Sequence, residues 1–332
     1  MQHQNDVRPG RILEISGSYW KTCTLHAAVK LGVFTAIGSR MITAEDLAGE
    51  MNVDSRALEM LLNALSAMDL LEKNENLFKN TAEASIFLEK SSPAYVGYMI
   101  MHHHHLMDSW LRLDSAVTTG KPVRSRATHS DAEWRESFLM GMYNLAMSIA
   151  PRIAELIDLQ NRRHFLDLGG GPGTYAIHFC LKNPHLNATI YDLPSTEPFA
   201  ASTIRRFGLQ DRVRFESGDY LREEIKGSFD VVWLSQILHG EGPEACQMII
   251  DRAVGAVEPG GLIFVHDFIL NNSMDGPLFP ALFSLNMLLG TPDGQSYSEE
   301  QIRNMLKRAG VKEIRRIPFQ GPNDSGIIGG TV

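Results

Sequence analysis

Apolar residues recur at spacings of three and four along much of the first 150 residues of this chain. The pattern is clearest from Ile12 to Leu31 and from Ala57 to Leu71, where Leu, Ile, Ala and Met form one stripe. This periodicity is typical of amphipathic helices, and the alternation expected of strands is nearly absent here. The pattern therefore predicts an almost wholly helical amino-terminal half.

From His164 onward, short apolar runs alternate with helical stretches and with turns rich in Gly, Pro, Asn and Asp. The apolar runs are FLDLG, ATIYDL, VRFESGD, FDVVWLS and GGLIFVHDF. Such alternation predicts parallel βαβ units and hence an α/β fold. We expect a helical domain over residues 1–100, linker helices over 101–155 and the α/β domain over 156–332.

The charge balance and the cysteines narrow the possible partners. A net charge of −8 disfavours binding to nucleic acid or to an anionic membrane surface. Cys23, Cys180 and Cys246 lie far apart and form no C-x-x-C pair, so neither a disulfide framework nor a zinc site is predicted. No apolar run approaches about 18 residues, and the amino terminus lacks the order of a secretion signal, so we expect a cytoplasmic protein.

The segment from Thr43 to Lys90 has the spacing of a winged helix-turn-helix. Thr43 is expected to cap one helix, Asp54 or Ser55 the next, and ENLFKNT to form the wing. The segment carries four basic and ten acidic residues, a composition that disfavours DNA binding. We therefore favour a scaffold or a dimer interface.

A glycine-rich turn follows the first predicted strand, in LDLGGGPGTYAIHF. A dinucleotide fingerprint that starts at Gly169 needs a further glycine where Thr174 stands, whereas Asp167-x-Gly169-x-Gly171-x-Gly173 is complete. Glycines let the backbone approach a ligand and adopt positive φ, so that its N–H groups can meet a carboxylate. The complete motif resembles the first motif of class I S-adenosylmethionine-dependent methyltransferases, whose cofactor carries a carboxylate at its methionyl end.

Polar residues follow the later predicted strands as well. Asp192, in IYDLP, ends the second strand, where a carboxylate can accept hydrogen bonds from both ribose hydroxyls. Asp219 and Tyr220, in ESGDY, end the third strand, where a carboxylate and a ring can meet an adenine. The fourth strand leads into WLSQILHGEGPE. All of these positions lie at the carboxyl edge of a parallel sheet, where open α/β folds bind ligands.

Together these motifs resemble the large O-methyltransferase family that includes plant caffeate and isoflavone enzymes and bacterial polyketide-tailoring enzymes. The resemblance extends over nearly the whole chain and rests on DLGGGPG, YDLP, GDY, ILHG, EPGGLIFVHDFIL and TPDGQSYSEEQIRNMLKRAG. It implies a Rossmann-like methyltransferase domain whose mostly parallel sheet ends in an antiparallel hairpin near EIRRIPF and GIIGGTV. It also implies a preceding winged-helix-type dimerisation domain, a homodimer formed through those helices, and S-adenosyl-L-methionine as cofactor.

The resemblance assigns roles to residues of this chain. Ser235 takes the position at which plant members often carry a cofactor-contacting lysine. The residues expected to bind the cofactor are Asp167, Gly169, Gly171, Gly173, Asp192, Asp219, Tyr220 and Ser235.

The resemblance also implies a catalytic base. A phenol with a pKa of about 10 leaves little phenolate at neutral pH, so a base with a pKa near 7 would raise the reactive fraction. His239, in ILHG, matches the family's catalytic histidine, and Asp267, in FVHDF, matches the acidic residue that orients it. Gly240 and Ser296 stand where plant members carry an aspartate and a glutamate, so base catalysis is expected to be partial.

The acceptor pocket is expected to use helices of the amino-terminal half. Phe138 and Met142, in ESFLMGMYN, match positions that sandwich the acceptor in plant enzymes, and Met287 adds soft apolar surface. In the run of four histidines only His102 and His105 share a helix face. A polar face without function, acceptor contact through His105 and a metal site all remain open, and no metal is assigned.

The sequence thus predicts an O-methyltransferase that acts on a hydroxylated aromatic or polyketide-like small molecule. C- or N-methyl transfer on the same fold remains an alternative, because the cofactor motifs do not depend on the acceptor atom. A cofactor-binding regulator without catalysis is the alternative from a different class.

Overall fold

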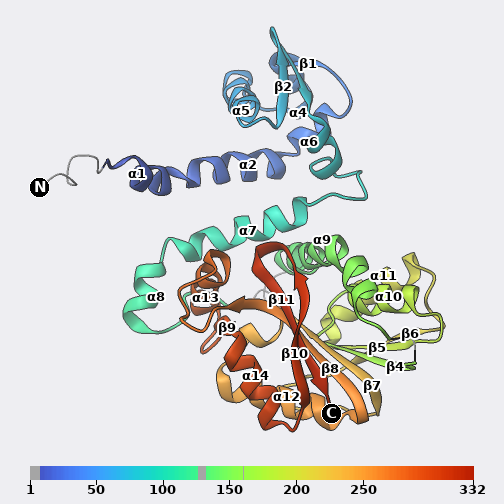
Figure 1. Ribbon diagram of the computed structural model, residues 1–332. Coiled ribbons are helices and arrows are strands. Elements are labelled where there is room, and N and C mark those ends of the chain that lie inside the picture. Colours follow the sequence, from blue (N-terminus) through green and yellow to red (C-terminus); the bar gives the residue numbers. More distant parts are fainter. Residues whose placement is uncertain (1–7, 126–131, 160) are drawn as a thin grey trace, which may run out of the picture. The chain divides into compact units, whose positions relative to one another are not determined.

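The computed structural model describes residues 8–125, 132–159 and 161–332 (Figure 1). The chain divides into two compact units between His105 and Leu106. This division falls within α7 (Gly97–Trp110), and the residues from Leu106 onward, which include most of the predicted linker segment, cluster with the large sheet. No helix in the described part of the chain is long and apolar enough to cross a membrane.

The first unit is helical with a small antiparallel sheet in the order β1-β3-β2. Thr43 caps α4 by accepting a hydrogen bond from Asp46 N at 3.1 Å, and Asp54 caps α5 by accepting one from Ala57 N at 2.8 Å. Both caps and the predicted wing, formed by β2 and β3, are confirmed. The elements are α1 (Gly10–Gly17), α2 (Tyr19–Leu31), α3 (Val33–Ile37), β1 (Ile42–Thr43), α4 (Ala44–Met51), α5 (Ser55–Ala67), β2 (Leu71–Asn74), β3 (Leu77–Asn80) and α6 (Ala82–Phe87).

The helical prediction was wrong at the end of α5. The helix stops at Ala67 instead of continuing to Leu71, because Asp69 adopts a left-handed conformation with φ 59°. Leu71 keeps its apolar side chain in the core, but as the first residue of β2. Helical spacing therefore missed the change of backbone conformation before Leu71.

Apolar side chains are unusually exposed on the first two helices. No residue of α1 belongs to the core of this unit, and α2 contributes to it only near its carboxyl end, through Ala28 and Val29. Large apolar surface left open to solvent on consecutive turns typically marks a protein interface. Between 53% and 69% of the surface is exposed for Ile12, Leu13, Ile15, Tyr19 and Trp20.

The second unit is built on a mostly parallel sheet in the order β10-β11-β8-β7-β4-β5-β6, with β9 paired to β8 (Figure 1). The strands β4 to β8 run parallel, whereas β11 pairs antiparallel with both β8 and β10. This arrangement confirms the predicted βαβ units and the carboxyl-terminal hairpin. The strands are β4 (His164–Leu168), β5 (Asn187–Asp192), β6 (Val213–Ser217), β7 (Phe229–Ser235), β8 (Val257–Leu270), β9 (Tyr297–Ser298), β10 (Lys312–Gln320) and β11 (Ser325–Thr331).

Helices cover both faces of this sheet, because successive strand residues point to opposite sides. Phe165 packs with α9, α10 and α11 on one face, whereas Leu166, the next residue of β4, packs with α12 and α14 on the other. The carboxyl ends of the strands are left at one edge, where the loops of the site begin. The helices are α8 (Leu113–Thr119), α9 (Ala132–Leu156), α10 (Thr174–Lys182), α11 (Glu197–Arg206), α12 (Pro243–Gly255), α13 (Leu278–Gly290) and α14 (Glu299–Arg308), with short 3₁₀ turns η2 (Pro194–Thr196), η3 (Leu238–Gly240) and η4 (Pro322–Asp324).

Candidate active site

The glycine-rich turn joins β4 to α10, and its backbone needs glycine. Gly169, Gly171 and Gly173 have φ angles of 67°, 55° and 79°, in the left-handed region that side chains disfavour. A Cβ at Gly173 would also lie 2.1 Å from Cδ1 of Ile190, and one at Gly169 would lie 2.6 Å from Cγ2 of Ile237. Side chains of Ile190 and Ile237 therefore pack closely against the turn, and the turn itself offers mainly backbone groups to a ligand.

Asp192, at the end of β5, holds this turn. Its Oδ2 accepts a hydrogen bond from Gly171 N at 2.7 Å, and its Oδ1 accepts from Leu193 N at 2.6 Å and from Thr196 Oγ1 at 3.3 Å. A carboxylate offers about two lone pairs on each oxygen, so only one remains, on Oδ2. Burial raises the pKa of Asp192, although these hydrogen bonds oppose the rise.

Asp167 lies beneath the turn and is fully buried. Its Oδ2 accepts a hydrogen bond from Ala176 N at 3.1 Å, which ties the start of α10 to β4. Its Oδ1 has no hydrogen-bond partner among the residues that the structure describes. Burial raises the pKa of Asp167 to about 7.

Asp219 and Tyr220 follow β6 after Gly218. Asp219 is partly exposed, and its Oδ1 accepts a hydrogen bond from Leu221 N at 2.9 Å. Tyr220 brings its ring to the glycine turn, since a Cβ at Gly169 would lie 3.4 Å from Cε1 of that ring. The structure therefore groups Tyr220 with Gly169 at one edge of the sheet.

Ser235, at the end of β7, faces a buried polar group that the sequence did not reveal. Its Oγ lies 2.9 Å from Nδ1 of His266, and the Tyr175 hydroxyl lies 3.4 Å from the same nitrogen. His266 is fully buried on β8, stacked on Trp233 with ring centroids 5.8 Å apart. Burial lowers the pKa of His266 to about 4, so the imidazole is neutral at neutral pH.

His239 and Asp267 are brought together across two strands. His239 lies in η3 directly after β7, and its Nδ1 lies 2.7 Å from Oδ1 of Asp267 on β8. That Oδ1 also accepts a hydrogen bond from Phe268 N at 2.8 Å. Because the carboxylate accepts, Nδ1 donates in this contact, and the neutral imidazole in this orientation has its lone pair on Nε2.

Two phenylalanines contact His239 and a third packs against both of them, and sequence reasoning missed all three. The ring of Phe268 stacks on the imidazole with centroids 6.0 Å apart, and Phe283 of α13 meets it edge to face at 4.8 Å. Phe279, one turn earlier on α13, packs against both phenylalanines. Phe279 and Phe283 are four residues apart in PLFPALF, and this spacing was the available signal.

The structure also shows the two positions, Ser296 and Gly240, at which plant members carry a carboxylate. Ser296 is completely buried, and its Oγ has no hydrogen-bond partner within the described ranges. Gly240 ends η3, and Gly294 packs against the backbone next to it. Neither position supplies a second carboxylate. Asp267 is therefore the carboxylate that orients the imidazole, through its contact with Nδ1.

The residues expected to contact the acceptor lie on three helices. Met287 is buried on α13. Phe138 and Met142 are partly buried and four residues apart, on one face of α9. His105 belongs to the first compact unit, whereas the other three belong to the second.

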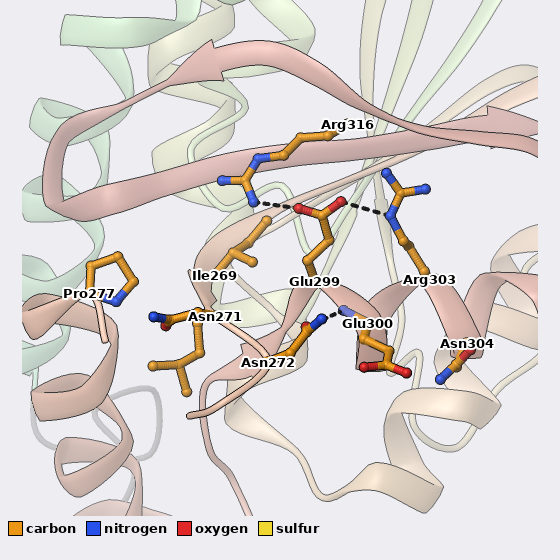
Figure 2. Close-up of a pocket in the computed structure, with 10 residues that line it drawn as sticks. Ile269, Asn271, Asn272, Pro277, Glu299, Glu300, Arg303, Asn304 and Arg316 are labelled. Carbon is orange, nitrogen blue, oxygen red and sulfur yellow. Dashed lines mark hydrogen bonds and ion pairs between the residues drawn. The ribbon is translucent and has the colours of Figure 1, made fainter. Parts of the chain in front are cut away.

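A separate surface pocket of about 620 Å³ lies between the end of β8, the start of α14 and β10 (Figure 2). Glu299 accepts hydrogen bonds from Nε of Arg303 at 2.7 Å and from Nη1 of Arg316 at 2.8 Å. These contacts tie β10 to α14 (Figure 2). The charged groups pair with one another, as in a structural ion-pair network.

A glycine turn of this type, beside an acidic strand end and a histidine–aspartate pair, defines a methyltransferase of the S-adenosylmethionine-dependent class. The model of the O-methyltransferase domain matches residues 110–312, and that of the O-methyltransferase dimerisation domain matches residues 13–90. The chain therefore belongs to the O-methyltransferase family, and S-adenosylmethionine is its cofactor. C- or N-methyl transfer and a regulator without catalysis are not favoured by these matches.

Relatives and solved structures resemble the chain over almost its whole length. A 3-hydroxy-5-methyl-1-naphthoate 3-O-methyltransferase of Streptomyces sahachiroi is 30% identical, over 97% of this chain and 95% of that protein. The tetracenomycin polyketide synthesis 8-O-methyl transferase TcmO of Streptomyces glaucescens is 31% identical, over 98% of each. An O-methyltransferase family protein from Burkholderia thailandensis has a TM-score of 0.88 and 28% identity, covering 98% of both chains.

Proposed function

We propose that this protein transfers the methyl group of S-adenosylmethionine to a hydroxyl of an aromatic or polyketide-like small molecule, with His239 as general base. The 2.7 Å contact between His239 Nδ1 and Asp267 Oδ1 is the observation that carries this proposal. It leaves Nε2 as the nitrogen that accepts the hydroxyl proton. Asp267 holds the ring in place and stabilises its positive charge after protonation.

The residues at the glycine turn fit the cofactor. When bound, S-adenosylmethionine supplies an electrophilic methyl group on a positively charged sulfur. The backbone of Gly169, Gly171 and Gly173, at the start of α10, suits a carboxylate because the first N–H groups of a helix attract anions. Asp192 keeps one lone pair on Oδ2 and therefore suits one ribose hydroxyl, fewer than the two expected from the sequence. Asp167 serves the fold of the turn, since its carboxyl bonds α10.

The surroundings of His239 support an aromatic acceptor. Phe268 and Phe283 offer flat apolar surface next to the imidazole, Phe279 extends that surface, and Met287 lies one turn beyond Phe283 on α13. These rings also limit the access of water to the base, which favours proton transfer from a positioned hydroxyl. Two relatives act on a hydroxynaphthoate and in tetracenomycin polyketide synthesis, which agrees with this class of acceptor.

The dimerisation-domain match supports a homodimer, and the exposed apolar residues of α1 and α2 are the surface we assign to it. We also place the protein in the cytoplasm, where its three unpaired cysteines, Cys23, Cys180 and Cys246, are chemically stable. Ile15→Asp combined with Trp20→Asp should shift the protein from dimer to monomer in sedimentation velocity. A dimer that survives both changes would place the interface elsewhere.

The catalytic role is tested with His239→Ala and a panel of hydroxylated naphthalenes and anthraquinones. We expect kcat to fall by about 100-fold or more, as for loss of a general base, while the Kd for S-adenosylhomocysteine stays within about twofold. His185→Ala, at an exposed position, is the matched control and should leave both quantities unchanged. Equal kcat in His239→Ala and the unmodified protein would exclude the base.

A further inference from the structure

The guanidinium of Arg124 is partly buried in the second unit, and none of the described carboxylates pairs with it. Its Nη2 donates hydrogen bonds to the backbone oxygen and to Oδ1 of Asn286, both at 3.2 Å, and its Nη1 donates to Ser125 O at 3.3 Å. These acceptors are neutral. Among the residues that the structure describes, no aspartate or glutamate forms an ion pair with Arg124.

The described surroundings of Arg124 contain no group that neutralises its charge. Its Nε is buried and has no hydrogen-bond partner in the described part of the chain. Burial lowers the pKa of Arg124 to about 10, the direction expected when a cation loses water and gains no anion. Buried charges in proteins are normally paired, so the lack of an anionic partner among the described residues requires an explanation.

The position of this guanidinium relates it to the catalytic base. On α13 the residues Phe283, Asn286, Met287 and Gly290 share one face, with spacings of three, four and seven. The guanidinium lies over the end of that face, because a Cβ at Gly290 would come within 2.4 Å of Cζ of Arg124. At the other end of the face, Phe283 contacts His239, with ring centroids 4.8 Å apart.

The face between these two ends has a definite length. Phe283 and Gly290 are seven residues apart on α13, which corresponds to about 10 Å along a helix axis. That distance matches a rigid molecule of two or three fused rings with a polar group at each end. Gly290 is buried and has no side chain, which leaves room for the guanidinium at this end of the helix.

We propose that Arg124 forms a subsite for a carboxylate of the acceptor, so that the preferred substrate is a hydroxylated aromatic acid. The planar guanidinium pairs with a carboxylate through two parallel hydrogen bonds, and the buried Nε has a donor to offer. The hydroxyl at the far end of the acceptor then lies at His239, with the rings against Phe283 and Met287. This inference rests on the proposed function for the place of the hydroxyl, but the subsite can be measured without turnover.

A role in helix capping is the competing explanation. Val123 N and Arg124 N both donate to Leu289 O in the last turn of α13, where a cation also interacts favourably with the helix dipole. Capping alone predicts a loss of stability on substitution, with no change in selectivity among ligands. The two explanations therefore predict different effects of substituting Arg124. Only the carboxylate subsite predicts that the preference for a charged ligand over a neutral one is lost.

The test compares 6-hydroxy-2-naphthoate with 6-hydroxy-2-naphthamide, which has the same shape and no charge. Both are titrated calorimetrically into the full-length protein saturated with S-adenosylhomocysteine. We expect the acid to bind about 10- to 100-fold more tightly than the amide, as for a charge-assisted bidentate pair. Arg124→Met should reduce this preference to less than about threefold, and Arg124→Lys should keep an intermediate preference because it keeps the charge.

Controls separate recognition from folding. Arg315→Met removes an exposed arginine of β10 and should leave the preference unchanged. Binding of S-adenosylhomocysteine by each Arg124 variant shows that the site is folded, and Arg124→Lys provides a second measurement if Arg124→Met is unstable.

The outcomes bear separately on the two proposals. If the acid binds no more tightly than the amide, or if Arg124→Met weakens both equally, the carboxylate subsite is wrong and capping explains Arg124. If the preference for the acid is present but no hydroxylated acceptor is methylated, the proposed function is wrong and the subsite stands.

Discussion

The cofactor edge and the base edge of the second unit lie on neighbouring strands, but they are built in different ways. At the cofactor edge, the turn from Gly169 to Gly173 donates a backbone hydrogen bond to Asp192, and the start of α10 directly after it donates one to Asp167. At the base edge, His239 is held by the side chain of Asp267 on another strand and by rings from α13. The first edge depends on backbone conformation and the second on side chains from distant segments. Substitutions at one edge should therefore leave the function of the other largely intact.

The largest effect is expected at the base edge, from Asp267→Asn. The asparagine amide can donate to Nδ1 of His239 as well as accept from it, so the tautomer with a free Nε2 is no longer favoured. We expect kcat to fall by about 100-fold, with the Kd for S-adenosylhomocysteine within about twofold. Asp275→Asn, in an exposed loop, is the control. A large loss of cofactor affinity in Asp267→Asn would show that the two edges are not independent.

Asp192→Ala is the matching change at the cofactor edge. It removes the acceptor of Gly171 N together with the one lone pair left for the ribose. We expect the Kd for S-adenosylhomocysteine to rise about 10- to 100-fold, and kcat at saturating cofactor to change less than about threefold. An unchanged Kd by calorimetry would exclude Asp192 from the cofactor site.

The buried imidazole of His266 lies between the two edges and makes a prediction about stability. Its pKa is lowered to about 4 in the folded protein, below the 6.5 of an exposed histidine, so the unfolded chain binds the proton more tightly. Its contribution to the free energy of unfolding is therefore present above pH 6.5 and is lost as the pH falls toward 4. Between pH 7 and pH 5, His266→Phe should lose about 2 kcal/mol less than the unmodified protein in urea unfolding. Identical losses in both proteins would mean that the histidine is not held neutral.

The smallest effect is expected from Phe283→Leu. This change removes the edge-to-face contact with His239 and keeps an apolar side chain on α13. The KM for an aromatic acceptor should rise about two- to tenfold, in line with the strength of aromatic pairs, and the Kd for S-adenosylhomocysteine should not move. Leu282→Ala, at a more exposed position on the same helix, is the control. A change in cofactor affinity without a change in KM would reverse the assignment of α13 to the acceptor side.

Much of the cofactor edge could be predicted from the sequence, because its signals are local. The glycines of the turn adopt positive φ. Glycine is the residue type that most readily adopts this angle, so the residue type alone predicts the backbone conformation. The role of Asp167 was less visible. Its carboxyl is turned under the loop to Ala176, and only the packed structure shows that it is fully buried.

The base edge was predicted only through the motif that contains His239 and Asp267. Nothing in the spacing of these residues, 28 positions apart, reveals a 2.7 Å contact, which requires β7 and β8 to be neighbours in the sheet. The same holds for Ser235, which was expected at the cofactor and is hydrogen-bonded to His266. The spacing of Phe279 and Phe283 indicated one helix face but not its contact with His239, and Arg124 gave no recognisable pattern, because both residues contact partners far along the chain.

The sequence alone determined the alternation of strands and helices in the second unit, the two helix caps in the first unit and the backbone of the glycine turn. All of these follow from the steric and hydrogen-bonding preferences of residues close together in the chain. The tertiary structure alone decided which nitrogen of His239 faces Asp267, which rings contact the imidazole, and that Nε of Arg124 is buried with no counter-charge among the described residues. These electrostatic and packing interactions act between atoms that are close in space. The local sequence pattern does not show which distant residues come into contact.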